Sequence, residues 1–291
     1  MNQEVKYGIF PSQSTSAVVK SILCFLFYAF PDVAFASGEP FPIGARSWGM
    51  GNATVAMGDY QSVFNNPAGV GFLKHNFIST SYHARYTISG LQTFSLSGNY
   101  NTKLCNLGLT AERFGDKLYN EQKLGLVLAK STNRVALGIK VSYLQAAIEN
   151  FTAKHSILTE FGVMAKLSSK FQIGFHAYNL TGAKLFASQR VPAVLRLGLA
   201  FMPTKQLLLT VEAEKDLDFS IIMKAGLEYQ IVKNFYLRTG ITSKLSNAHF
   251  GLGFQAKQFL FDYAASNHAA LGFSHHLGVT YQLSKNKNLH Q

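Results

Sequence analysis

Three adjacent side chains, Ser274, His275 and His276, are the residues whose types most suggest chemistry in this sequence. A serine beside a histidine could supply a nucleophile and its general base. However, these residues fall at the start of a stretch that alternates like a strand, and neighbours on a strand point to opposite faces. The pair therefore fails the requirement that nucleophile and base lie within hydrogen-bond reach. We assign no catalytic residue and predict that the protein is not an enzyme.

The sequence also lacks complete motifs for binding a metal or a cofactor. The sequence has no cysteine pair at ligand spacing and no H-E-x-x-H segment, so we predict no metal site. Gly49 and Gly51 form only part of a dinucleotide fingerprint, without its third glycine or a preceding strand, so we predict no cofactor. Cys24 falls in a predicted export signal, which leaves Cys105 without an intramolecular disulfide partner.

Charged residues within strongly alternating segments are better candidates. In 135–144 every odd-numbered residue is large and apolar, and Lys140 lies on the opposite face. The segment 219–231 repeats the pattern, with Lys224 and Glu228 on its polar face. A helix would spread these charges around its circumference. A period of two, with one apolar and one polar face, is typical of strands in a transmembrane β-barrel.

The alternation recurs from residue 77 to the C-terminus and predicts an all-β, antiparallel barrel of about fourteen strands over 76–291. The expected strands are 77–88, 91–101, 104–114, 120–130, 133–145, 156–167, 170–180, 192–202, 206–216, 219–231, 234–244, 248–256, 258–266 and 275–283. A soluble β-sandwich with the same alternation is the alternative.

The junctions between these segments divide into two sets. Those after even-numbered strands are tight, whereas those after odd-numbered strands, including 115–119, 146–155, 181–191 and 267–274, are longer on average. Outer-membrane barrels have short periplasmic turns and longer outer loops. We therefore expect both ends of the barrel domain on the periplasmic side.

Pairing apolar residues across each turn predicts the register of two hairpins. Around 232–234, Ile231 faces Phe235 and Glu228 faces Arg238, and around 203–205, Phe201 faces Leu207 and Arg196 faces Glu212. Opposite charges across an antiparallel pair contribute about 0.2–1 kcal/mol. We expect Arg196, Glu212, Glu228 and Arg238 to line a polar, mixed-charge lumen. Inward glycines between them either admit a ligand or a plug close to the wall or relieve barrel curvature.

The N-terminal region differs from the rest of the chain. The apolar run 21–30 follows Lys20 and is shorter than the ~20 residues that a membrane-spanning helix needs. With small residues at Ala34 and Ala36, it predicts a secretory signal over 1–36 and a mature start at Ser37, the alternative being a buried N-terminal helix. The stretch 37–75, rich in Gly, Ala, Asn and Met, is predicted to be a plug or short-helix segment.

A net charge of +12 raises the question of nucleic-acid binding. The excess cations are scattered over turns and strand ends, whereas a nucleic-acid footprint is clustered on one face. We therefore predict no nucleic-acid partner. Cations of the outer loops, Lys184 and Arg190 among them, are expected to contact phosphates of lipopolysaccharide, so that outer-membrane lipids are the expected partners.

Two N-terminal segments carry a family resemblance. The segment GARSWGMGNATVA (44–56), followed by SVFNNPAG (62–69), resembles the N-terminal signature of the PorV/PorQ-like proteins of Bacteroidetes, which belong with the wider group of FadL-like outer-membrane barrels. LYNEQKLG (118–125) and AGLEYQ (225–230) look like the same family. The resemblance implies a fourteen-stranded barrel in the outer membrane with an N-terminal hatch in its lumen.

The triplet Asn66, Pro67 and Ala68 is the candidate hatch motif. Asparagine can cap backbone amides and proline needs no donor at a helix start, so the triplet predicts a turn or the start of a helix. The resemblance assigns such a turn to the hatch. Arg46 and Asp59 are expected to help the inward charges hold it.

The resemblance implies two roles. One is an accessory role in type IX protein secretion, with secretion components as partners, and the alternative is FadL-like transport of small hydrophobic molecules. The short loops leave little room for a transporter's capping domain, which favours the accessory role at this stage.

Overall fold

The computed structural model describes residue 38 and residues 40–185, 190–243, 247–268 and 270–283. The chain divides into two units, Met1–Phe35 and Ala36–Gln291, and the description below concerns the second. The predicted signal over 1–36, with its cleavage site, lies outside the described residues.

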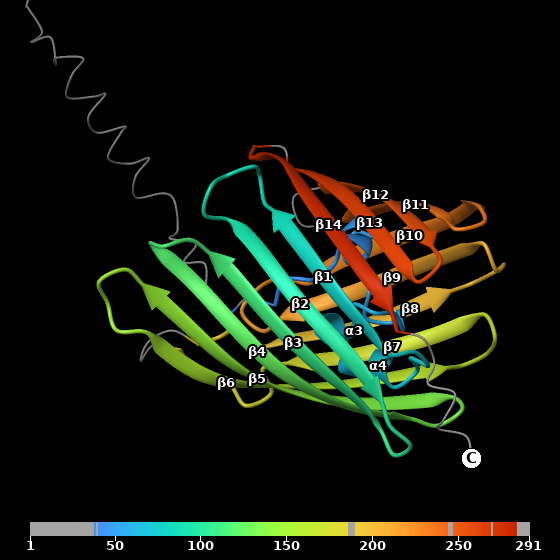
Figure 1. The fold of residues 1–291 in the computed structure, drawn as a ribbon, viewed down its shortest axis with the longest axis horizontal. Coiled ribbons are helices and arrows are strands. Elements are labelled where there is room, and N and C mark those ends of the chain that lie inside the picture. Colours follow the sequence, from blue (N-terminus) through green and yellow to red (C-terminus); the bar gives the residue numbers. More distant parts are fainter. Residues whose placement is uncertain (1–37, 39, 186–189, 244–246, 269, 284–291) are drawn as a thin grey trace, which may run out of the picture. The chain divides into compact units, whose positions relative to one another are not determined.

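The second unit is a closed antiparallel barrel, in which each strand pairs with its neighbours in sequence and β1 pairs with β14 (Figure 1). The described strands are β1 (Phe77–Ala84), β2 (Gln92–Asn101), β3 (Asn106–Gly115), β4 (Tyr119–Ser131), β5 (Val135–Ile148), β6 (Lys154–Lys166), β7 (Phe171–Tyr178), β8 (Val194–Phe201), β9 (Leu207–Asp216), β10 (Ile222–Val232), β11 (Phe235–Thr242), β12 (Asn247–Ala256), β13 (Phe259–His268) and β14 (Gly272–Gln282). The predicted fold class is confirmed. Closure leaves no unpaired sheet edge.

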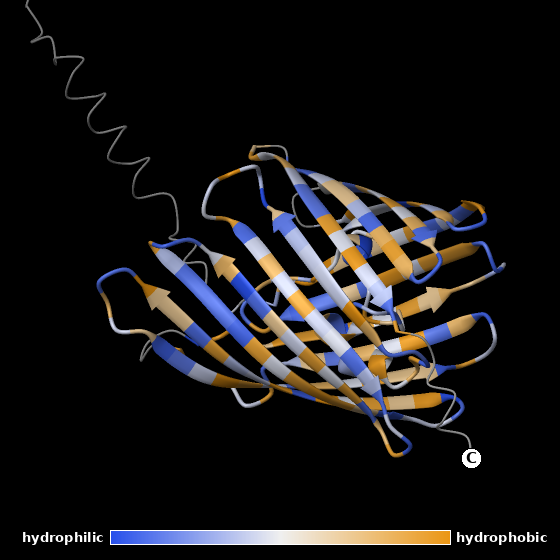
Figure 2. Ribbon diagram, viewed as in Figure 1, coloured by the Kyte–Doolittle hydropathy of each residue, from blue (hydrophilic) through white to orange (hydrophobic). Residues whose placement is uncertain are grey.

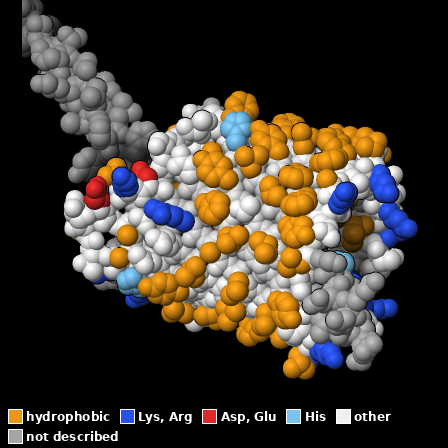
Figure 3. Space-filling view, in the orientation of Figure 1, with side chains coloured by type: hydrophobic (Ala, Val, Ile, Leu, Met, Phe, Trp, Pro, Cys, Tyr) orange, Lys and Arg blue, Asp and Glu red, His pale blue; other side chains and the backbone are white. Residues whose placement is uncertain are grey.

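Alternation along each strand separates an apolar outer face from an inner one. Along β5 the odd-numbered residues Val135 to Tyr143 are 40–50% exposed, whereas Lys140 is 1% exposed. The same alternation appears as bands along the ribbons in Figure 2. In Figure 3 hydrophobic side chains cover the middle of the visible face, and Lys and Arg side chains gather at its right-hand edge.

The connections differ between the two ends of the barrel. At one end, here the turn end, the connections after even-numbered strands have two to five residues, and at the other, the loop end, they have three to fifteen. The predicted loop 267–274 is too long, because Asn267 pairs with Phe273 and His268 with Gly272. That ladder leaves three residues, 269–271, between β13 and β14.

Two predicted cross-strand pairs are corrected by the register. Phe201 pairs with Leu209 instead of Leu207, because the connection between β8 and β9 has five residues. At the next turn Phe235 pairs with Val232 instead of Ile231, because a bulge lies between Gln230 and Val232. A bulge inserts one unpaired residue and shifts the ladder locally.

Three short helices precede the barrel, α2 (Ala45–Gly49), α3 (Ser62–Asn65) and α4 (Pro67–Val70). No helix among the described residues has the length and apolarity to cross a membrane. Their residues are largely buried, and they pack against the inner faces of the strands.

Candidate functional site

The region 40–75, here the internal segment, runs through the barrel from the loop end to β1 at the turn end. Its helix α2 contacts β11 to β14, α3 contacts β2 and β3, and α4 contacts β3 to β6. The segment therefore touches the wall on several sides. The role of this segment as a plug or hatch stays a prediction.

The motif Asn66, Pro67 and Ala68 starts helix α4, as its residue types predict. Asn66 is the N-cap, with its side-chain oxygen accepting a hydrogen bond from Ala68 N (3.1 Å), and Pro67 occupies the first helical turn. The side-chain amide nitrogen of Asn66, Nδ2, donates hydrogen bonds to Val55 O (2.6 Å) and to Phe175 O on β7 (3.3 Å). One buried side chain therefore caps the helix and links the internal segment to the barrel wall.

Arg46 of α2 joins the internal segment to a chain of wall charges. Its guanidinium donates to both carboxylate oxygens of Glu228 (2.7 and 2.8 Å) and to Asp59 (2.9 Å). Glu228 also accepts from Arg238 (2.6 Å), as the predicted cross-strand pair requires, and Arg238 donates to Asp262 (2.6 Å). Bidentate contacts of this kind fix orientation as well as adding attraction.

Burial affects the pKa of Arg46 and that of Asp59, both in the internal segment, differently. Burial alone would lower the pKa of Arg46, but the carboxylates of Glu228 and Asp59 outweigh it and the pKa is raised. Burial raises the pKa of Asp59 above its ordinary value, against the opposing effect of Arg46. Acidification therefore weakens the contact between Arg46 and Asp59 at a higher pH than an exposed aspartate would require.

A second group of charges lies on β8 to β10. Arg196 pairs across the ladder with Glu214, not with Glu212 as predicted, because the longer connection shifts the register by two residues. Its Nε donates to Glu214 (2.6 Å) and lies 4.0 Å from Glu212. Lys224 contacts Glu212 (3.0 Å) and Glu214 (2.7 Å). A shift of two keeps every side chain on its face, so the inward charges still meet.

This second group also contacts the internal segment through its backbone. One carboxylate oxygen of Glu212 accepts from the N–H groups of Thr54 and Val55, both at 2.8 Å. Arg196 donates to Pro40 O (2.8 Å). Wall side chains thus satisfy backbone groups of an irregular segment, which would otherwise be costly to bury.

Inward glycines allow the internal segment to touch the wall directly. A Cβ at Gly138 would lie 2.3 Å from Pro67 C, and one at Gly174 would lie 2.1 Å from Val55 O. Cβ positions at three more inward glycines fall within 2.4 Å of segment atoms: Gly162, Gly226 and Gly240. Close approach, rather than curvature alone, accounts for these five glycines.

Sequence reasoning missed a cluster of histidines around Trp48. The indole stacks on His276, with centroids 4.1 Å apart, and lies 5.9 Å from His249 and 6.4 Å from His83. His83 and His276 share a hydrogen bond between their Nδ1 atoms (2.8 Å). Trp48 is the one tryptophan of the chain and lies in a segment that was expected to enter the lumen. It was the sequence feature that could have indicated this cluster.

The fold does not bring together the adjacent residues Ser274, His275 and His276 as a catalytic group. His275 lies on the outer face beside Tyr263, whereas Ser274 and His276 face inward. The Ser274 hydroxyl accepts from Tyr86 N (2.9 Å), and His276 contacts His83 and Ser266. Among the described residues no group of three or more His, Cys, Asp or Glu could hold a metal ion.

Apolar residues at the loop end form a buried group, here the mouth cluster. It comprises Leu144, Ala146, Leu158, Tyr178, Leu185, Val191 and Val194. Two of its members come from the connection between β7 and β8, so this long loop folds inward over the wall. The loop end thus holds a buried apolar cluster beside the start of the internal segment.

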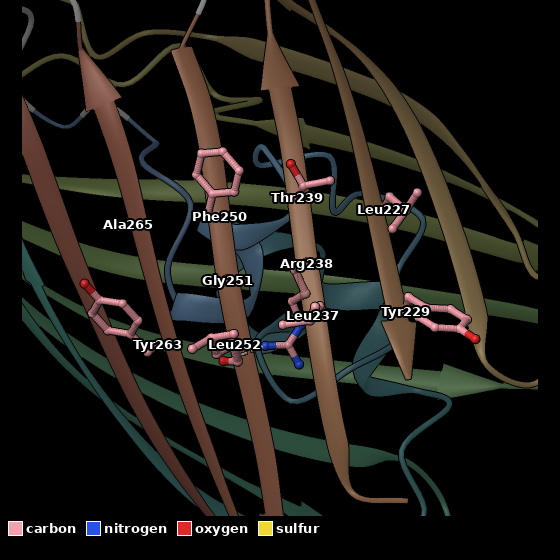
Figure 4. A pocket seen from close by; sticks show the side chains of 10 residues that line it. All are labelled: Leu227, Tyr229, Leu237, Arg238, Thr239, Phe250, Gly251, Leu252, Tyr263 and Ala265. Atoms are coloured by element: carbon pink, nitrogen blue, oxygen red, sulfur yellow. Dashed lines mark hydrogen bonds between the residues drawn. The ribbon is translucent and has the colours of Figure 1, made fainter. Parts of the chain in front are cut away.

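A separate apolar groove of about 500 Å³ lies on β10 to β13 (Figure 4). Thr239 and Ala265 are short side chains in the same cross-strand row as Leu227 and Phe250, which opens the groove on the outer face. The ladder between β11 and β12 continues beneath it without interruption. The groove therefore ends at an intact wall, and we place no passage there.

The chain thus folds as a closed fourteen-stranded antiparallel barrel around an N-terminal segment. The toluene transporter TodX of Pseudomonas putida is similar, with a TM-score of 0.61 and 11% identity, covering 84% of this chain and 99% of TodX. The toluene transporter TbuX of Ralstonia pickettii matches with a TM-score of 0.60 and 11% identity, covering 84% and 98%. No protein-family model and no curated protein matches the sequence. At this identity the likeness concerns the fold, and the resemblance to PorV and PorQ stays a prediction.

Proposed function

We propose that this protein is an outer-membrane channel or transporter for small hydrophobic molecules, of the size of monoaromatic hydrocarbons. The observation that carries the proposal is the likeness of the whole barrel to two toluene transporters. Transport was the alternative function in the sequence analysis. It is better supported than an accessory role in secretion. The latter stays a prediction, since it rests on the sequence resemblance alone.

The outer surface supports a membrane location. Residues 135–143 of β5 carry five exposed apolar side chains in succession. Nine residues at ~3.3 Å each, tilted by ~40°, span roughly 23 Å along the membrane normal, close to the ~25 Å apolar band of outer-membrane barrels. The outer membrane is the membrane in which such barrels are found, and the export signal predicted from the sequence agrees with it.

Passage through the lumen would require the internal segment to move. Its ion pairs, capping contacts and glycine contacts reach β5, β6, β7, β10 and β11, so the described state is a closed one in this proposal. An apolar solute arriving at the loop end could enter only where the buried mouth cluster opens. Displacement of the segment would then open the polar wall behind it.

Uptake by a deletion strain tests the proposal. We expect cells without the protein to take up a labelled monoaromatic hydrocarbon several-fold more slowly at limiting concentration, and the wild-type chain to restore the rate. Uptake of a small sugar provides the control for general permeability. Unchanged hydrocarbon uptake would reject the transport proposal, and retention of secreted cargo in the same strain would support the accessory role.

A further inference from the structure

The stretch 40–42 of the internal segment crosses the lumen at the loop end of the barrel. Pro40 O accepts a hydrogen bond from Arg196 on β8 (2.8 Å), and the Phe41 ring lies against Arg85, the residue that follows β1. β1 and β8 are seven strands apart in the closed ring of fourteen, so they lie on opposite sides of the barrel. The stretch therefore spans the mouth of the lumen.

The backbone around Phe41 is rigid, although its side chain is not enclosed. Pro40 and Pro42 each fix a φ angle, and the residue before a proline is restricted to extended conformations. Pro42 O also accepts a hydrogen bond from Trp48 Nε1 (2.9 Å). Phe41 is nonetheless 38% exposed, whereas Ile43 is 3% exposed. A large aromatic side chain is thus held at a fixed place with much of its surface uncovered.

Arg85 presents a cationic surface to aromatic rings. Its Cζ lies 3.6 Å from the centroid of the Phe41 ring and 5.1 Å from that of Phe114 on β3. Its Nη2 donates to Thr93 Oγ1 on β2 (3.4 Å). Both ring distances are within the range in which a cation is attracted to the negative face of an aromatic ring. Phe114 belongs to the wall, like Arg85, so only the Phe41 ring would leave when the internal segment moves.

The surroundings of Arg85 continue into the mouth cluster. Phe114 makes an edge contact with Tyr119, with ring centroids 6.4 Å apart, and Tyr119 packs against the mouth cluster. Aromatic and apolar side chains therefore lead from the mouth cluster to the guanidinium. A solute that entered where this cluster opens would arrive beside Arg85.

We propose that Arg85 and Phe114 form a recognition site for the aromatic ring of a solute, and that Phe41 occupies this site in the closed state. A solute ring replaces the Phe41 ring over the guanidinium, which releases the stretch 40–42 from the β1 side of the mouth. A saturated ring of the same size has no negative face and gains nothing from the cation. The site thereby selects aromatic over alicyclic molecules.

As a step of transport, this inference rests on the proposed function, so binding and uptake are measured separately. Binding of benzyl alcohol and of cyclohexylmethanol, which differ in the saturation of the ring, can be measured by saturation-transfer NMR on the full protein in lipid nanodiscs. We expect the wild-type protein to bind benzyl alcohol about two- to fivefold more tightly, the difference that a partly exposed cation–π contact gives.

Two variants should change this preference in opposite ways. R85M removes the charge and keeps an apolar stem, so the preference should disappear while cyclohexylmethanol binds as before. F41A removes the competing ring and should strengthen benzyl alcohol binding at least about twofold. R113Q and F151A are the matched controls, because Arg113 is exposed on β3 and Phe151 is 74% exposed in the loop between β5 and β6. Both should bind as the wild type does.

A structural role of Arg85 alone predicts a different result. Equal weakening of both ligands in R85M, or no gain of benzyl alcohol binding in a folded F41A, would overturn the inference. Uptake of toluene and methylcyclohexane by the complemented deletion strain separates the two claims. Selective binding without uptake of either hydrocarbon would reject the proposed function and leave the site, whereas uptake with unselective binding would reject the site and leave the function.

Discussion

Arg46 connects the internal segment to the wall by the most direct ion pairs, those to Glu228 and Asp59. In R46Q, Glu228 keeps Arg238, but Asp59 loses its cation while remaining buried. Removing one partner of a buried pair typically costs about 3–5 kcal/mol. We expect R46Q to lower the unfolding temperature of the barrel and to expose the segment to protease.

The unfolding temperature would be measured from the difference in gel mobility between unheated and heated samples. Limited proteolysis would measure how accessible the internal segment is to protease. R134Q is the control, since Arg134 is exposed in the turn between β4 and β5 and should behave as wild type. Equal protease resistance of R46Q and R134Q would show that the ion pairs do not hold the segment.

Lys184 and Arg190 belong to the predicted contacts with lipopolysaccharide. The two residues face each other across an isolated bridge in the loop between β7 and β8, and both are exposed. Exposed ionic contacts contribute about 0.2–1 kcal/mol each, so replacing both by glutamine should weaken lipopolysaccharide retention roughly fivefold. Native mass spectrometry can count retained lipids, with K170Q at the turn end as control. Unchanged retention would reject these contacts.

Individual charged cross-strand partners were predicted correctly at one hairpin and wrongly at the other. The pair of Glu228 and Arg238 was right because the bulge lies beyond Gln230, outside the part of the ladder that contains both. The pair of Arg196 and Glu212 was wrong because the turn before β9 is two residues longer than its apolar pattern suggests. Alternation fixes the face of a side chain, whereas the turn fixes its partner.

At the scale of elements, the glycines of the wall decide how closely the internal segment packs. A Cβ at Gly138 on β5 would lie 2.3 Å from Pro67 C, a backbone atom that cannot move without displacing helix α4. We expect G138A to destabilise the packed segment by more than about 2 kcal/mol, as overpacking in tight interiors does. The urea midpoint and protease resistance of the segment would both fall.

G278A provides the matched control on β14. A Cβ there would meet its nearest neighbours at 3.8 Å, which is ordinary contact, so the same chemical change should have little effect. If both alanine variants lost the same stability, the cost would belong to strand glycines in general. The close contact with Pro67 would then not be the cause of the stability loss in G138A.

The strands were predictable from sequence for a reason that does not extend to the helices. Each strand repeats a period of two over eight or more residues, and lipid outside and polar contacts inside enforce it throughout. Helices α2 to α4 have only four or five residues, too few to show a helical period. Cap chemistry at Asn66 identified one helix start, but the packing of α2 around Trp48 depends on histidines from three distant strands.

At the scale of the whole molecule, the internal segment either closes a pore or forms part of the folded core. Its contacts are numerous enough for the second role, since carboxylates, a capping asparagine and wall glycines all meet it. Apolar side chains of the segment also pack against the wall, as Ala68 does against Ala136 and Met164. The barrel, however, closes through a continuous ladder that does not include the segment. A barrel that closes by itself can retain its fold without the segment.

Deletion of residues 44–74 separates these roles. We expect the shortened chain still to show the heat-dependent band shift of a folded barrel, and its conductance in a planar bilayer to rise at least severalfold above the wild type, because the charged wall would then line an open lumen. R46Q, which keeps the segment but loses its ion pairs, should give brief openings between these extremes. A folded deletion variant with wild-type conductance would show that the segment does not close the pore, and the hatch proposal would fail.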